Sequence, residues 1–112
     1  MAMEFSKYVY AIDLDTARVI STTGGLSDMK RKIAAKAKLG KPFPESVVFY
    51  QASIKSPLLQ LDTDELIGYH MIQNALVAGV ACGVDAKTVI SRLTEAGFVK
   101  AVEMEKVKMF GS

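Results

Sequence analysis

The stretch that decides the fold is residues 7–14, which read KYVYAIDL. Its even-numbered positions carry two tyrosines, an isoleucine and a leucine, whereas its odd-numbered positions carry smaller or charged residues. This period of two residues predicts a β-strand. Residues 18–22, RVIST, follow a short turn and are predicted to return as the second strand of a hairpin.

A helix and a further strand are predicted after the hairpin. The helix should run from Ser27 to about Leu39, because a capping hydroxyl precedes an acidic first turn and Gly40 follows the last apolar residue. Residues 46–52, SVVFYQA, form a β-branched and aromatic run. Such a run predicts a strand that is buried on both faces.

The C-terminal half predicts two helices and a last strand. A long helix is expected over residues 64–82, and Asp85 is expected to cap a shorter helix over residues 86–96. Residues 98–110 alternate apolar with charged side chains, which predicts one strand or a loose hairpin. The order ββαβααβ indicates a single α+β domain over residues 1–112. We expect a small antiparallel sheet of about four strands, with three helices packed mainly on one face.

The composition is that of an ordinary globular domain. Half of the 112 residues are apolar and 23% are charged, with a formal net charge of +2. Cys82 is the only cysteine, so no disulfide can form within the chain, and its apolar neighbours predict a buried thiol. The N-terminal residues lack an apolar signal core, and the longest apolar stretch, residues 66–84, is interrupted by polar side chains. We therefore expect a cytoplasmic protein that has no membrane partner.

The helix predicted over residues 64–82 is apolar nearly all round, so most of its surface must be covered. Its small residues Gly68, Ala75 and Gly79, with Gly83 following, form a ridge that would let another backbone approach closely. The candidate residues for self-association are Gly68, Ile72, Ala75 and Gly79. Such a ridge predicts a homo-oligomer, most simply a homodimer in which this helix packs against its own copy. The alternative interpretation is a central core helix of a monomer.

A basic segment lies between residues 29 and 44, where six cations occur without an acidic residue. The cations are Lys30, Arg31, Lys32, Lys36, Lys38 and Lys41. This asymmetry predicts an electrostatic contact surface for a nucleic acid or for an acidic protein partner. The alternative interpretation is a helix whose cations are simply solvated.

Residues 78–89, AGVACGVDAKTV, resemble the helix–turn–helix signature of bacterial DNA-binding regulators. The resemblance consists of a small residue four positions before a turn glycine, followed by a branched apolar residue and a capping residue. It implies that Ala86, Lys87 and Ser91 face the major groove of DNA. It also implies that Arg92 reaches the DNA backbone.

The sequence offers no constellation for catalysis, because no nucleophile or carboxylate is tied by spacing to His70, the only histidine. One histidine and one cysteine do not make a structural zinc site. We therefore expect no catalytic, cofactor-binding or metal-binding residues, and an enzyme ranks third among the function classes. The first hypothesis is a non-catalytic binding module that acts as a homodimer through residues 64–82. The alternative is a nucleic-acid-binding protein that uses the helix pair over residues 78–96, the basic residues 30–41, or both.

Overall fold

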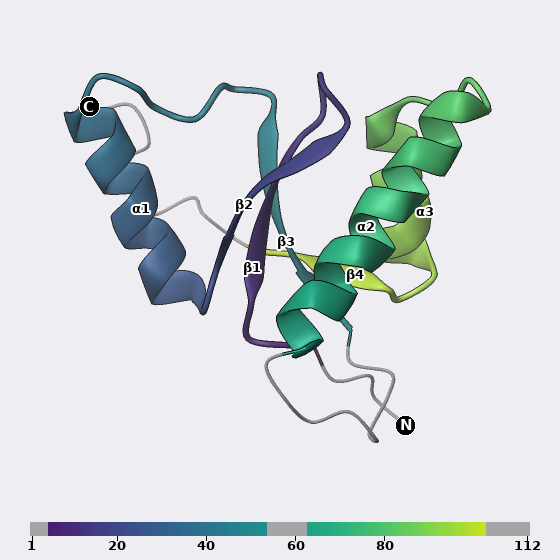
Figure 1. Ribbon diagram of the computed structural model, residues 1–112, viewed down its shortest axis with the longest axis horizontal. Coiled ribbons are helices and arrows are strands. Elements are labelled where there is room, and N and C mark those ends of the chain that lie inside the picture. Colours follow the sequence, from purple (N-terminus) through teal and green to yellow (C-terminus); the bar gives the residue numbers. More distant parts are fainter. Residues whose placement is uncertain (1–4, 54–62, 103–112) are drawn as a thin grey trace.

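A four-stranded antiparallel sheet lies between two helical layers (Figure 1). The computed structural model describes residues 5–53 and 63–102. The elements are β1 (Val9–Asp13), β2 (Arg18–Thr23), α1 (Leu26–Lys38), β3 (Val47–Ala52), α2 (Thr63–Ala81), α3 (Ala86–Glu95) and β4 (Val99–Ala101). The predicted α+β class and the order ββαβααβ are confirmed. The part of the predicted last strand beyond residue 102 lies outside the described residues.

The strand β1 is central because both of its edges are paired. Tyr10 lies opposite Thr22 of β2 on one side and opposite Tyr50 of β3 on the other. The short strand β4 pairs with the outer edge of β3, where Gln51 lies opposite Lys100. The sheet order is therefore β2-β1-β3-β4, and each neighbouring pair is antiparallel.

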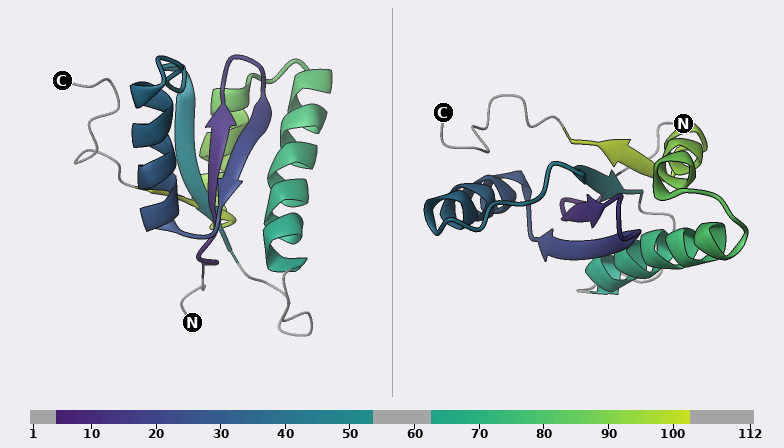
Figure 2. Two further views of the ribbon diagram at one scale, coloured as in Figure 1. Left: turned by 60° about the vertical axis from the view of Figure 1, so that its left-hand side comes forward. Right: turned by 90° about the horizontal axis from the view of Figure 1, so that it is seen from above.

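Side chains of β1 reach both helical layers, because successive residues of a strand point to opposite faces. Tyr10 and Ile12 lie in a core cluster with residues of α2 and α3, whereas Val9 and Ala11 lie in a second cluster with residues of α1. Two of the three helices therefore share one face, as expected, and α1 covers the other (Figure 2). The physical reason is that β1 is apolar on both sides, so each face of the sheet needs its own cover.

The side chain of Gln73 connects α2 to the edge strand β2 through two hydrogen bonds to backbone groups. Its amide oxygen accepts a hydrogen bond from the N–H of Val19 at 2.9 Å, and its amide nitrogen donates to the carbonyl of Ala17 at 3.4 Å. The register of the β1–β2 pair shifts at Ile20, directly after these two residues. Gln73 thus satisfies backbone groups that a sheet edge leaves unpaired.

The capping prediction is confirmed for α3 and is wrong for α1. The Asp85 carboxylate accepts a hydrogen bond from the N–H of Thr88 at 2.8 Å, at the N-cap of α3. Gly25, not Ser27, occupies the N-cap position of α1, and no side chain caps that helix. The Thr23 hydroxyl instead donates to the Gly25 carbonyl at 3.0 Å. The last residue of β2 therefore stabilises the turn that leads into α1.

Candidate interaction surface

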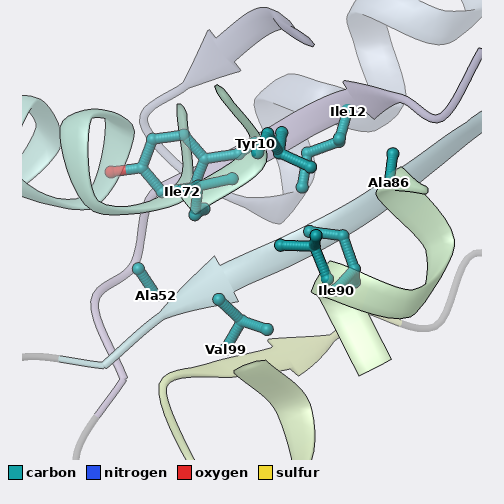
Figure 3. Close-up of a cluster of buried hydrophobic side chains, with 9 residues drawn as sticks. Tyr10, Ile12, Ala52, Ile72, Ala86, Ile90 and Val99 are labelled. Carbon is teal, nitrogen blue, oxygen red and sulfur yellow. The ribbon is translucent and has the colours of Figure 1, made fainter. Parts of the chain in front are cut away.

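The four α2 residues predicted to mediate self-association lie on the inner side of the helix. A Cβ atom at Gly68 would collide with the buried ring of Tyr10 and would lie 3.1 Å from the Cβ of Ala52. Ile72 is 0% exposed and belongs to the core cluster drawn in Figure 3. The close approach at Gly68 is therefore made by the sheet of the same chain.

The second half of the predicted ridge packs in the same way. A Cβ atom at Gly79 would collide with the side chain of Val89 in α3. Ala75 is half-buried and packs against the same cluster as Ile72. The prediction that this ridge is the self-association surface is wrong, because packing within the chain uses all four positions. The small residues do permit close approach, but what approaches is the chain's own sheet and α3.

The opposite side of α2 is exposed and largely apolar. Four large apolar side chains there are between 42% and 59% exposed. They belong to Leu66, Ile67, Val77 and Val80. We call the surface formed by these four residues and by the exposed residues His70, Asn74, Ala78 and Ala81 the α2 outer face. No charged residue occurs between Leu66 and Val84. Depletion of charge and exposure of apolar side chains together are typical of an interaction surface.

His70 and Cys82, the chain's only histidine and cysteine, lie along α2 and at its end. His70 is exposed, and its ring packs edge-on against Tyr69 with the ring centres 5.2 Å apart. Cys82 is exposed just after the last residue of α2, so the prediction of a buried thiol is wrong.

Within residues 5–53 and 63–102, no three His, Cys, Asp or Glu side chains gather as a metal ion would require. The same residues include no helix with both the length and the apolar character needed to span a bilayer.

Two carboxylates have a pKa below the ordinary value of aspartate, and both hold local structure. The Ser46 hydroxyl donates to Asp13 at 2.8 Å and is the main cause of the lowered pKa, with the N–H of Asp15 donating at 2.9 Å. The hydroxyl and N–H of Thr88 lower the pKa of Asp85 in the same way. A lowered pKa makes each carboxylate a weaker base, which is the opposite of what general-base catalysis needs.

The six cations of the basic segment lie on α1 and in the loop that follows it. Lys36 is half-buried, and its Nζ lies 5.0 Å from the centre of the Phe43 ring. Arg31 forms an exposed ion pair with Asp28 at 3.1 Å. The other four are exposed and form no ion pair with any residue that the structure describes: Lys30, Lys32, Lys38 and Lys41.

The two groups of predicted DNA contacts lie on opposite faces of the sheet. Lys87 and Arg92 are exposed on α3, whereas the basic segment belongs to α1 (Figure 1). The fold therefore does not bring these cations together. Ala86, which the helix–turn–helix resemblance places in the major groove, is only 3% exposed and lies in the core. That part of the implied contact surface is wrong, because the first turn of α3 packs onto the sheet.

Sequence reasoning missed the α2 outer face, although the absence of charge from this helix was visible. A helix that is apolar on all sides has no period that separates an inner from an outer face.

Comparisons of the chain with protein-family models, with curated proteins and with solved structures gave no match. A function is therefore inferred from the surfaces of the chain itself.

Proposed function

We propose that the protein is a non-catalytic binding module that works as a homodimer, held together through the α2 outer face. The observation that supports this proposal is an exposed apolar helix face without charge, in a chain whose other helices point charges outward. The exposed residues of α3 include Lys87, Arg92 and Glu95, and those of α1 include most of the basic segment. Apolar area of this kind is unfavourable in water, and a second copy of the same face would cover it.

The spacing along the α2 outer face favours a second copy over a different partner. Leu66 and Ile67 lie eight and seven residues before Asn74, and Val80 and Ala81 lie six and seven residues after it. At a rise of about 1.5 Å per residue, both apolar pairs lie roughly 10 Å from Asn74. In an antiparallel pair with its two-fold axis at Asn74, the apolar ends of each helix meet those of the other.

The centre of the proposed pair is polar but uncharged. Asn74 carries both a donor and an acceptor, so its side chain can form hydrogen bonds with its own symmetry copy at the axis. A single polar pair of this kind fixes the register of two packed helices at some cost in stability. His70 lies one turn from Asn74 and would face Ala78 of the other copy.

A substitution at Val77 tests the proposal. Burying the exposed half of a valine is worth about 1 kcal/mol. A two-fold interface contains this valine twice, so losing the burial of both copies weakens the dimer by roughly 2 kcal/mol. This corresponds to an increase of about 30-fold in the dissociation constant. In Val77→Lys, two ammonium groups must also leave water, which weakens the dimer further. Sedimentation velocity should therefore show a dimer for the unaltered chain and a monomer for Val77→Lys at the same concentration.

Leu39→Lys is the matched control. Leu39 is 77% exposed and follows α1 on the other side of the sheet, so the same change from an apolar residue to lysine should leave the dimer intact. Circular dichroism should report both variants as folded. A chain that sediments as a monomer up to about 1 mM, or a Leu39→Lys variant that dissociates as readily as Val77→Lys, would contradict the proposal.

A second candidate function is the binding of nucleic acid, and it is supported by the four lysines of the basic segment that form no described ion pair. Affinity for duplex DNA should then fall steeply between about 50 and 200 mM salt, since each phosphate contact releases a counterion. Joint reversal of Lys30 and Lys38 to glutamate should remove the binding, whereas Lys87→Glu on the opposite face should not. The reverse pattern in a gel-shift titration would assign the binding to α3 and exclude α1.

A further inference from the structure

A cleft of about 150 Å³ lies between α3 and the sheet. Its walls are formed by Leu14, Val48, Tyr50, Lys87, Ile90 and Ser91. The cleft lies on a side of α3 different from the one that faces α2, because α3 contacts α2 through Val89 at Gly79. It is therefore separate from the α2 outer face and independent of the proposed dimer.

The cleft exists because two elements are short. The strand β4 pairs with β3 only from Tyr50 to Ala52. The Val48 end of β3 therefore pairs with β1 on one edge but has no neighbouring strand on its outer edge among the described residues. The helix α3 has ten residues and is about 15 Å long. The side chains of Leu14 and Val48, at the far end of the sheet, are consequently only half-buried.

The lining combines an apolar floor with polar groups at its mouth. Ile90 is 2% exposed and belongs to the core, and Leu14 and Val48 pack against the same cluster. Lys87 and Ser91 are one helical turn apart, so they lie on the same side of α3. An ammonium and a hydroxyl thus stand beside an apolar surface, which suits an amphipathic anion.

Lys87 is available to bind such an anion. It forms no ion pair within residues 5–53 and 63–102. The nearby carboxylate of Asp85, two residues earlier, is held by the N–H of Thr88 at 2.8 Å as the cap of α3. Asp85 attracts Lys87 electrostatically but forms no ion pair with it, so a carboxylate that enters the cleft would find an ammonium group that is free to pair with it.

We propose that this cleft binds a small carboxylate whose apolar body is about the size of a benzene ring. A dry cavity of about 150 Å³ is known to hold benzene in another protein, so the volume matches such a body. Pockets that enclose drug-sized ligands have volumes of about 300–1,000 Å³, so this cleft encloses only a small apolar body. The apolar body lies on Leu14, Val48 and Ile90, and the carboxylate accepts hydrogen bonds from Lys87 and Ser91.

Benzoate is the probe, with benzamide as its uncharged counterpart, in titrations followed by amide NMR shifts. We expect benzoate to saturate with a dissociation constant on the order of 1 mM, because a ligand of this size buries little area in an open cleft. The shifts should gather at residues of the cleft, such as Val48, Lys87 and Ser91. Benzamide should bind several-fold more weakly, because it lacks the charge that Lys87 would pair.

Lys87→Met keeps the apolar stem of the side chain and removes its charge. It should weaken benzoate about tenfold and leave benzamide unchanged, since a charge-assisted pair is lost and the apolar contact is kept. Lys100→Met, at an exposed lysine of β4, is the matched control and should bind benzoate like the unaltered chain. Shifts that stay linear up to about 20 mM, or equal benzoate binding by Lys87→Met, would overturn the proposal. Monomeric Val77→Lys should bind benzoate normally, so failure of the dimer and failure of the cleft are distinguished.

Discussion

Gly68→Ala tests the packing of α2 on the sheet, because it adds one methyl group where the helix meets β1 and β3. The new Cβ would lie 2.9 Å from the Cζ atom of Tyr10, closer still to its hydroxyl oxygen, and 3.1 Å from the Cβ of Ala52. Tyr10 is 0% exposed and Ala52 is 1% exposed, so neither can move aside without disturbing the core. Overpacking of this kind costs about 1–3 kcal/mol.

Helix propensity acts in the opposite direction. Replacing a glycine by alanine inside a helix is worth about 1 kcal/mol, so the net expectation for Gly68→Ala is a loss of up to about 2 kcal/mol. For a domain of this size, such a loss lowers the melting temperature by up to about 8 °C. The free energy of unfolding can be measured by urea denaturation, with circular dichroism as the signal.

The exposed position Ala34, in the middle of α1 and away from the α2 outer face, gives the size of the propensity effect. Ala34→Gly should destabilise by about 1 kcal/mol through propensity alone. In a Tyr10→Phe background, the cost of Gly68→Ala should shrink, because the hydroxyl that the new methyl group meets is gone. If Gly68→Ala instead stabilises the chain by about 1 kcal/mol, the inner side of α2 has been assigned incorrectly.

Two further predictions concern α3 and the edge of the sheet. Asp85→Ala should lower the urea midpoint of unfolding at pH 7, whereas Asp85→Asn should leave it almost unchanged, since asparagine also caps helices. Because Thr88 lowers the pKa of Asp85 in the folded chain, this stabilisation is complete above about pH 4 and is lost as the pH falls further. Asp85→Asn should therefore flatten the acid side of a pH-stability curve, and an unchanged acid limb would refute the capping role. Gln73→Leu should cost about 1–2 kcal/mol in urea denaturation, because the N–H of Val19 loses its acceptor; a neutral result would show that water replaces the amide.

The local elements were predictable because each carries its own signal. Residues 7–14 alternate with a period of two, and the structure confirms β1 there, with its two sides packed in two separate clusters. Asp85 precedes a helix whose inner residues recur at helical spacing, and it caps that helix as predicted. These signals depend on a few neighbouring residues, so they can be read without knowledge of the fold.

The orientation of elements in space was not predictable in the same way. Which face of the sheet α1 covers depends on the crossover between β2 and β3, and no local period records it. The inner side of α2 could not be identified, because apolar residues such as Ile72 and Val77 occur all round the helix, yet one is buried and the other exposed. Cys82 was misjudged for a related reason: its neighbours are apolar, but the chain has already left α2 and turned toward solvent.

The central claim, an antiparallel homodimer about Asn74, can be tested by disulfide cross-linking. Asn74→Cys, combined with Cys82→Ser, should form a disulfide-linked dimer on mild oxidation, because the two copies of residue 74 meet at the axis. The native Cys82 lies eight residues from Asn74, so in this pair the two thiols are about 24 Å apart, far beyond the Cα separation of about 6 Å that a disulfide allows. The account predicts efficient cross-linking at position 74 and none at Cys82 under the same conditions. Cross-linking at Cys82 with a monomeric Asn74→Cys variant would contradict it.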